Sequence, residues 1–134
     1  VWGPGDPHLI PRVLARAKAG KLRKVGGRDP VVDVTYMDNA ADAHLLAADQ
    51  LVSGSAVAGK AYFISNGEPV GLWWFIDRIL SDAGLSPVTK AVPLWQAKLA
   101  GRVLEWAYRT FRLSGEPAMT RFVADQLSTS HWYD

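Results

Sequence analysis

The sequence predicts an α/β fold that is mostly helical with short strands, and three features of the chain support this prediction. Five segments show the apolar spacing or the end signals of helices. Short runs of β-branched and aromatic residues lie between them, as expected for strands. Turns rich in glycine and proline separate the two kinds of segment. At 134 residues, the chain is long enough for one domain with a hydrophobic core.

The chain opens on an apolar strand end that runs directly into a Gly/Pro turn. A folded chain rarely starts inside a strand, because an isolated strand end leaves its backbone groups unpaired, so we expect a fragment of a longer protein. Asp6 and Pro7 have the pattern of a helix N-cap followed by a first-turn proline. A further proline at position 11 favours a turn first and then a helix over residues 11–19, which Gly20 ends.

Two short strands are expected next, over residues 22–25 and 31–37. The turn sequence Gly-Gly-Arg-Asp-Pro joins them and predicts a hairpin. Asp38 or Asn39 then caps a helix over residues 40–51. This helix is rich in alanine, and small side chains suit close packing on a sheet.

The middle of the chain alternates between strand and helix signals. A loop over residues 52–59 leads to residues 61–65, Ala-Tyr-Phe-Ile-Ser, which predict a buried strand. Residues 66–69, Asn-Gly-Glu-Pro, form a turn. A helix follows over residues 72–83 and ends at a glycine, and a further strand is expected over residues 89–92.

The segment 94–113 has the most regular pattern in the chain. Its charged residues recur at spacings of four and three, which places them on one stripe of a helix. They are Lys98, Arg102, Glu105, Arg109 and Arg112. The remaining surface is apolar over a wider sector than one core-facing stripe needs. The helix therefore either packs between other elements or lies on a membrane with its cationic stripe toward the headgroups. A shorter helix is expected over residues 120–126.

Composition excludes several kinds of site. The net charge of +2 gives no support for nucleic-acid binding, and the absence of cysteine excludes disulfides and thiolate metal sites. The three histidines lack the spacing of metal ligands. The sequence contains neither a glycine-rich nucleotide-binding motif nor the GxSxG motif of serine hydrolases.

Basic residues gather near the beginning of the chain. They are Arg12, Arg16, Lys18, Lys21, Arg23, Lys24 and Arg28. This cluster is either a surface that binds phosphate or, more simply, the solvated face of a helix and a hairpin.

Two places have the character of a ligand site. The first is the strand-to-helix turn Gly-Pro-Gly-Asp-Pro-His, with Pro4, Gly5 and His8, because open α/β sheets bind ligands beyond the carboxyl ends of their strands. The second is the strand that delivers Tyr36 and Asn39 to a helix start. The simpler alternatives are a rigid connector at the turn, a packed tyrosine and a capping asparagine. No residue is assigned as catalytic or as a metal ligand.

Taken in order, these places resemble the C-terminal half of the extended short-chain dehydrogenases/reductases. In that family a strand ending in Gly-Pro precedes a helix, a small hairpin, a Tyr-x-Asp-[Asp/Asn] helix start and a buried strand that ends at an Asn-Gly turn. The corresponding segments here are residues 1–6, 11–19, 22–37, 36–39 and 61–67. Together they span essentially the whole chain.

Within this family the likeness is closer to the 3β-hydroxysteroid dehydrogenase branch. The sequences Gly-Pro-Gly-Asp, Asp-Val-Thr-Tyr-Met-Asp-Asn, Gly-Glu-Pro and Thr-Arg-Phe all fit that branch. Nucleotide-sugar epimerases usually carry an arginine where Val32 stands, so the substrate is expected to be apolar, uncharged or a carboxylate. Residues 62–69 and 128–134 resemble more specifically the bacterial reductases that act on 2-alkyl-3-oxoalkanoates.

The resemblance implies the substrate lobe of an extended Rossmann-type reductase, in which residues 40–66 return to the dinucleotide-binding domain. The implied reaction interconverts a 3-oxo and a 3-hydroxy group on an apolar substrate, and a sterol dehydrogenase is the alternative. NADP or NAD would be bound mainly by the N-terminal half, which would also carry the catalytic serine, tyrosine and lysine. Residues 1–134 alone are therefore expected to be inactive, with Pro4, Gly5, His8, Tyr36 and Asn39 in contact with substrate.

The expected partners are the apolar substrate, the N-terminal half of the enzyme and a second copy of the chain. No nucleic acid is expected as a partner. We expect a cytoplasmic location, with peripheral membrane contact through residues 94–113 as an alternative. A membrane- or partner-binding module that uses this amphipathic helix is the competing interpretation from another functional class.

Overall fold

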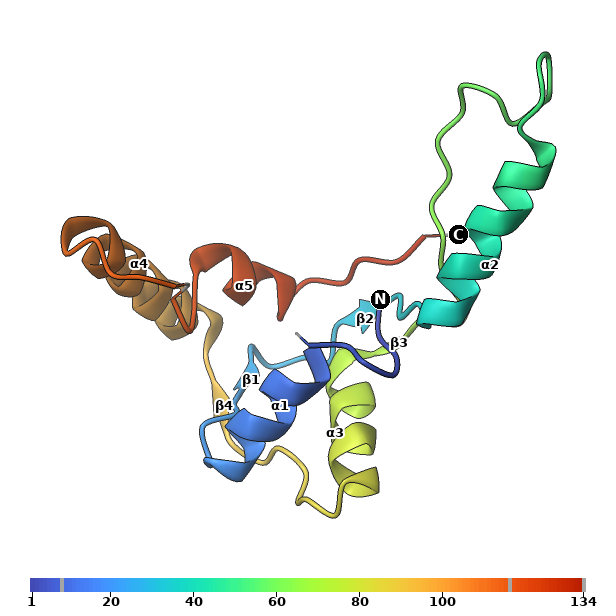
Figure 1. Ribbon diagram of the computed structural model, residues 1–134. Coiled ribbons are helices and arrows are strands. Elements are labelled where there is room, and N and C mark those ends of the chain that lie inside the picture. Colours follow the sequence, from blue (N-terminus) through green and yellow to red (C-terminus); the bar gives the residue numbers. More distant parts are fainter. Residues whose placement is uncertain (8, 116, 134) are drawn as a thin grey trace.

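The computed structural model describes residues 1–7, 9–115 and 117–133. Its described part is α/β and mostly helical, as predicted, with short strands (Figure 1). In chain order the elements are α1 (Leu9–Lys18), β1 (Lys24–Val25), β2 (Val31–Val32), α2 (Met37–Gln50), β3 (Val70–Gly71), α3 (Leu72–Asp82), β4 (Ala91–Val92), α4 (Leu94–Thr110) and α5 (Arg121–Gln126). In Figure 1, α2 and the loop after it extend to one side, α4 lies on the other, and α1 and α3 lie between them.

The hydrophobic core lies where α1, α3, α5 and the strand pair β1–β4 meet. Leu80 of α3 and Val25 of β1 are fully buried at its centre, and Val13, Ile76 and Ala124 pack in the same cluster. The spacing of Trp73, Ile76 and Leu80 along α3 places all three on one face of the helix.

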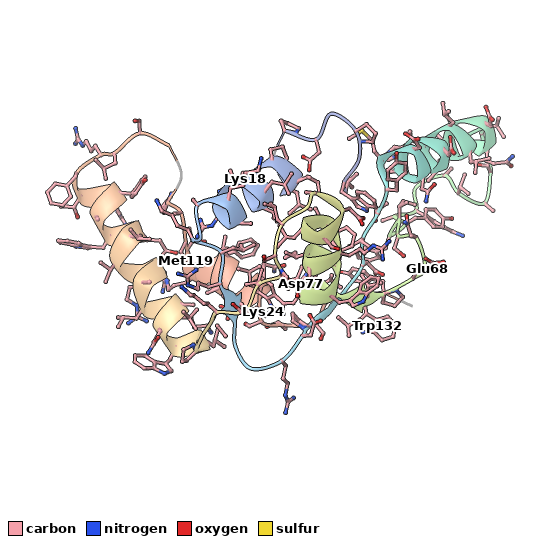
Figure 2. The ribbon with its side chains drawn as sticks, turned by 90° about the horizontal axis from the view of Figure 1, so that it is seen from below. Lys18, Lys24, Glu68, Asp77, Met119 and Trp132 are labelled. Atoms are coloured by element: carbon pink, nitrogen blue, oxygen red, sulfur yellow. The ribbon has the colours of Figure 1, made fainter. Side chains whose placement is uncertain are left out.

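A salt bridge ties β1 to α3 beside this core. Lys24 Nζ lies 2.9 Å from Asp77 Oδ2, and the other carboxylate oxygen accepts a hydrogen bond from the backbone N–H of Val88 at 2.8 Å. Figure 2 labels both charged residues. Asp77 therefore joins α3 both to β1 and to the segment that leads into β4.

The predicted hairpin is wrong, because its two strands do not pair with each other. β1 pairs in parallel with β4, and β2 pairs antiparallel with β3. The turn sequence between β1 and β2 is held by α3 instead. Asp29 accepts hydrogen bonds from the backbone N–H groups of Trp73 at 2.7 Å and Trp74 at 3.1 Å, and the Pro30 carbonyl accepts one from Leu72 at 2.9 Å. These bonds direct the chain toward α3 rather than back along β1.

The predicted buried strand over residues 61–65 is also wrong. This segment is not a strand, and Tyr62 and Phe63 are mostly exposed, with 75% of Phe63 accessible to solvent. A strand requires a neighbour for its backbone groups, and no described strand lies beside it. The carbonyl of Ile64 accepts a hydrogen bond from the Thr35 hydroxyl at 3.2 Å, and Phe63 stacks on Tyr133 with ring centroids 4.1 Å apart.

Helix ends follow the capping chemistry closely, with two corrections. The first helix begins at Leu9 rather than at position 11, because the Asp6 carboxylate accepts hydrogen bonds from the N–H groups of Leu9 and Ile10 at the helix start. α2 begins at Met37, and neither Asp38 nor Asn39 caps it. The predicted helix over residues 72–83 is confirmed by α3, and the short helix predicted over residues 120–126 is confirmed by α5. At the start of α5, the Thr120 hydroxyl accepts a hydrogen bond from the N–H of Val123 at 3.1 Å.

α4 packs on α5 through its small residues and not through its large ones. Ala97 and Gly101 are buried at this contact, while Lys98 and Glu105 of the charged stripe form ion pairs with Asp125 and Arg121 of α5. Part of the charged stripe therefore faces a neighbouring helix rather than solvent. The exposed side of α4 carries the large apolar residues, which are Trp95, Leu99, Val103 and Trp106.

Candidate functional site

The turn near the start of the chain lies directly beside the start of α2. The N–H of Trp2 donates to the carbonyl of Thr35, and the N–H of Met37 donates to the carbonyl of Trp2, both at 2.9 Å. These two bonds form a parallel bridge between Trp2 and Tyr36. The structure thus brings together the two places that the sequence analysis predicted as ligand sites.

The geometry of the turn follows from its glycine and proline residues. The N–H of Asp6 donates to the carbonyl of Gly3 at 3.1 Å, and Gly5 has a φ of +81°. A type II turn requires a left-handed residue, usually glycine, at its third position and commonly has proline at its second. Gly3 also permits close approach, because a Cβ there would lie 2.9 Å from the Cβ of Met37. Pro4 and Gly5 are exposed at the tip of the turn.

Tyr36 and Asn39 share one hydrogen-bond acceptor, the side-chain oxygen of Asn66. Asn66 Oδ1 accepts from the backbone N–H of Tyr36 at 3.2 Å and from Nδ2 of Asn39 at 3.0 Å. The sequence analysis interpreted Asn66 only as a turn residue and missed this role. The signal for it was the Asn-Gly pair, in which Gly67, with a φ of +71°, turns the chain after the asparagine.

An aromatic cluster fixes the ring of Tyr36. Trp2 makes edge-to-face contacts with Tyr36, at a centroid distance of 5.1 Å, and with Phe75 of α3, at 5.4 Å. Such pairs contribute about 0.5–1.5 kcal/mol beyond the area that they bury. No described residue hydrogen-bonds the Tyr36 hydroxyl or the side-chain oxygen of Asn39, so both groups are available to a ligand.

The chemistry of this site is positioning by neutral hydrogen-bonding groups. An amide, a phenol and a rigid turn can orient a carbonyl, hydroxyl or carboxylate group of a ligand. Pro4, Gly5, Tyr36 and Asn39 lie as described, whereas the fifth predicted residue, His8, lies outside the described residues.

A second concave region lies between α1, the β1–β4 pair, α4 and α5. It is a cavity of about 630 Å³ whose wall is mainly aliphatic, with Met119 on the segment between α4 and α5. Figure 2 labels Met119 between α4 and α1. Four basic side chains complete its lining, those of Arg12, Arg16, Lys21 and Arg23. The sequence analysis interpreted these basic residues as a phosphate-binding surface or a solvated face and did not place them beside a cavity.

The described residues include four short strands. Their strands form two sheets of two strands each, and neither is followed by a glycine-rich turn at a helix start. Within residues 1–7, 9–115 and 117–133 no group of three or more acidic, histidine or cysteine side chains could hold a metal ion. In the same ranges, no helix has the length and apolar character needed to cross a membrane.

Comparison with known proteins identifies the family. The model of the 3-beta hydroxysteroid dehydrogenase/isomerase family matches residues 1–94. The chain is 55% identical over 135 residues to 2-alkyl-3-oxoalkanoate reductase of Shewanella oneidensis, covering 100% of this chain and 35% of that protein. The reductase of the same name from Stenotrophomonas maltophilia is 49% identical, over 99% of this chain and 40% of that protein.

More distant similarities agree with this assignment. The human sterol-4-alpha-carboxylate 3-dehydrogenase, decarboxylating, is 38% identical over 71% of this chain and 26% of that protein. The crystal structure of gox2253 superimposes with a TM-score of 0.50 at 22% identity, covering 90% of this chain and 33% of that chain, and shows a shared fold. The chain thus spans 40% or less of the length of each of these proteins. It belongs to the 3-beta hydroxysteroid dehydrogenase/isomerase family, and its homologues are oxidoreductases.

Proposed function

We propose that this chain forms the substrate-binding part of an NAD(P)-dependent oxidoreductase that interconverts a 3-oxo and a 3-hydroxy group on a 2-alkyl-3-oxoalkanoate. One observation supports this proposal most strongly. The exposed turn at Pro4 and Gly5 is held against Tyr36 in a chain that is 55% identical, from end to end, to a reductase named for that substrate. His8, which follows this turn in the sequence, is part of the proposed site.

The proposed roles follow from the hydrogen bonds of the site. Asn66 fixes one side of the Asn39 amide, which leaves the amide oxygen to accept a hydrogen bond from a substrate hydroxyl. The Trp2 contact fixes the Tyr36 ring, which leaves its hydroxyl to donate to a carbonyl or carboxylate oxygen. NAD or NADP would be bound mainly by residues outside this chain, and no hydride- or proton-transfer step is assigned to residues 1–134.

Exposed apolar surface on α2 and the segment after it supports the proposed division of the enzyme. Leu45 and Leu46 of α2 and Phe63 are each more than 60% exposed. Large apolar side chains left exposed in one region of a chain are typical of an interaction site. We propose that residues 40–66 pack on the dinucleotide-binding half, and that the same surface joins two copies of the chain when that half is absent.

A substrate comparison in the full-length protein tests this proposal. NADPH consumption with a 2-alkyl-3-oxoalkanoate is measured beside NAD reduction with a 3β-hydroxysterol. We expect turnover of the oxo acid and little or none of the sterol. Turnover of the sterol alone would replace the proposal with the sterol dehydrogenase alternative, and turnover of neither would refute the assigned substrate class.

The exposed side of α4 supports a second candidate function, contact with a membrane surface. Trp95, Leu99, Val103 and Trp106 recur at spacings of four, four and three, and each is more than half exposed. Exposed arginines of the charged stripe flank this apolar row, as in helices that lie in the interface of anionic bilayers. Flotation with anionic vesicles that is lost on Trp106→Asp would support this function. Equal flotation of the variant, or none of the parent, would exclude it.

A further inference from the structure

The segment that follows α5 crosses the molecule and is fastened along β2. Figure 1 shows it leaving α5 on the side away from α4 and running toward α2. We call its residues 128–133 the strap. The N–H of His131 donates to the carbonyl of Val31 at 2.9 Å, and the N–H of Asp33 donates to the carbonyl of His131 at 3.3 Å. The N–H of Val31 donates to the Ser130 hydroxyl at 3.0 Å, and a parallel bridge thus joins the strap to β2.

Both ends of the strap are fixed. Before it, Ala124 of α5 is fully buried in the hydrophobic core, and Leu127 packs against that core. At its other end, the Asp33 carboxylate accepts a hydrogen bond from the backbone N–H of Tyr133 at 2.8 Å. Because this bond uses the backbone of Tyr133, it places the residue and leaves the ring to contact another segment.

The ring of Tyr133 supports the segment that carries Asn66. It stacks on Phe63 with the ring centroids 4.1 Å apart and an interplanar angle of 14°. Among the described residues, no backbone N–H or carbonyl of residues 61–66 pairs with the backbone of another segment. The position of this segment therefore depends on side-chain contacts, and the stack supplies one of them from the strap.

Asn66 is the acceptor on which the candidate site depends. Its Oδ1 lies 3.2 Å from the backbone nitrogen of Tyr36 and 3.0 Å from Nδ2 of Asn39. The Thr35 hydroxyl donates to a carbonyl of the same segment at 3.2 Å. Bonds of this length lie at the upper limit of the usual range, so a small displacement of the segment would break them. Support from the strap therefore bears directly on the orientation of the Asn39 amide.

The stack contributes more to position than to the stability of the fold. Tyr133 is 55% exposed and Phe63 is 75% exposed, so the two rings bury little apolar area. The hydrophobic core is centred on Leu80 and Val25, and neither ring belongs to it. Loss of the Tyr133 ring should thus loosen residues 61–66 locally and leave the fold intact.

We propose that Tyr133 is a positioning residue of the substrate site. Its ring supports Phe63 and so keeps Asn66 where it orients the amide of Asn39. The Asp33 carboxylate holds Tyr133 in place for this role. The inference rests on the proposed function, because that proposal gives Asn39 its contact with substrate. It adds a residue that lies outside the site and affects substrate affinity through the intervening side chains.

Steady-state kinetics of the full-length protein with a 2-alkyl-3-oxoalkanoate and NADPH test the proposal. Tyr133→Ala should raise KM for the oxo acid about two- to fivefold, and leave kcat and KM for NADPH within about twofold of the parent. Tyr133→Phe keeps the stack and should retain the parent's values. In a protein that already carries Asn66→Ala, Tyr133→Ala should raise KM for the oxo acid no further, because both changes act through the same amide.

Hydrogen exchange at the N–H of Tyr36 tests the structural step alone. It is measured by NMR in the full-length protein without substrate. Since that N–H is bonded to Asn66, Tyr133→Ala should speed its exchange about twofold or more, and Tyr133→Phe should not. The N–H of Val88, which is bonded to Asp77 beside the core, reports on the fold and should exchange as in the parent.

Trp132→Ala is the matched control, because it removes a larger ring from the neighbouring position of the strap. Figure 2 labels Trp132, and no ring of the described residues stacks on it. This variant should match the parent both in KM for the oxo acid and in exchange at Tyr36.

The following results would overturn the inference. Unchanged exchange at Tyr36 in Tyr133→Ala would show that the strap does not support the segment, and faster exchange with an unchanged KM would separate the strap from substrate binding. A Tyr133→Phe variant as impaired as Tyr133→Ala would assign the effect to the hydroxyl instead of the stack. An equal rise in KM for NADPH would make the strap a general element of the fold.

Failure of the proposed function would give a different result. The parent would then not turn over the oxo acid, although exchange at Tyr36 could still be measured. Faster exchange in Tyr133→Ala, restored in Tyr133→Phe, would in that case still support Tyr133 as the residue that positions Asn66.

Discussion

Replacement of Gly101 by alanine should destabilise the chain, although alanine is the better helix former. Gly101 lies in α4 where the helix meets the start of α5. A Cβ at this position would lie 2.7 Å from the backbone nitrogen of Arg121 and 2.7 Å from the carbonyl carbon of Thr120. Real Cβ atoms essentially never come within 3.0 Å of such atoms. Gly101 is therefore required by the close approach of the two helices.

The neighbouring backbone cannot move aside at little cost. Glu105 Oε1 accepts a hydrogen bond from the N–H of Arg121 at 2.7 Å, and its other oxygen pairs with the Arg121 side chain at 3.0 Å. Thr120 caps the same helix start through the N–H of Val123. A shift of Thr120 and Arg121 away from α4 would break these bonds.

The net effect is a difference of two terms. Glycine to alanine inside a helix gains about 1 kcal/mol. Overpacking against a fixed neighbour costs about 1–3 kcal/mol, and close contact with three backbone atoms of the Thr120–Arg121 peptide group favours the upper value. We therefore expect Gly101→Ala to lower the free energy of unfolding by about 2 kcal/mol, or the melting temperature by roughly 8 °C at about 4 °C per kcal/mol.

Urea denaturation and thermal melting measure this effect, and Gly27→Ala is the matched control. Gly27 has no atom within 4 Å of its would-be Cβ and no left-handed φ, so alanine there should be neutral or slightly stabilising. A Gly101→Ala variant as stable as the parent, or more stable, would show that α4 does not approach α5 as closely as described.

Three further predictions concern the same elements. Asp29→Ala removes both carboxylate acceptors at the start of α3 and should lower the free energy of unfolding by about 1–2 kcal/mol. Asp29→Asn keeps one acceptor oxygen and should lose less stability than the alanine variant. Equal free energies of unfolding for the parent and both variants would argue against this cap. Leu80→Ala should cost about 2–5 kcal/mol because Leu80 is fully buried, while Leu45→Ala on the exposed side of α2 should cost little, and similar losses at both would contradict the core assignment. The backbone N–H of Arg121 donates a hydrogen bond to the Glu105 carboxylate and holds the pKa of Glu105 below its ordinary value of 4.5. The stability that this ionised carboxylate contributes is therefore complete above pH 4.5 and is lost as the pH falls through the lowered pKa. In urea denaturation at a series of pH values from 6 to 3, the free energy of unfolding of Glu105→Gln should therefore fall less steeply with pH than that of the parent. An equally steep fall in both proteins would count against the pairing of Glu105 with Arg121.

Local signals in the sequence predicted most helices, because helix ends depend on nearby residues. Gly84 follows the end of α3, and Thr120 caps α5, as expected from sequence alone. The start of the first helix was misplaced by two residues, because Pro11 was given more weight than the capping carboxylate of Asp6.

Strand pairing could not be predicted in the same way, because it depends on residues far apart in the sequence. The partner of β1 is β4, which lies about seventy residues later in the chain. The hairpin prediction used only the turn sequence and overlooked that Asp29 serves α3. The strand prediction for residues 61–65 identified apolar residues correctly but could not supply the neighbouring strand that they need.

The candidate site was predicted in part for the same reason. The turn around Gly5 and the segment at Tyr36 were each recognisable, and the Trp2 bridge places them together. Asn66 was missed because its role depends on a contact across thirty residues. The lining of the cavity was not predicted because it comes from five separate stretches of chain, of which only the basic residues had a local signature.

The central claim is that this chain recognises the substrate while other residues bind the coenzyme. Steady-state kinetics of Asn39→Ala in the full-length protein test it most directly, with Asp42→Ala on the exposed surface of the same helix as the control. Loss of one hydrogen bond predicts about a three- to tenfold rise in KM for the 3-oxo acid, with KM for NADPH unchanged. An unchanged KM for the acid together with a raised KM for NADPH would contradict the claim and assign this site to the coenzyme.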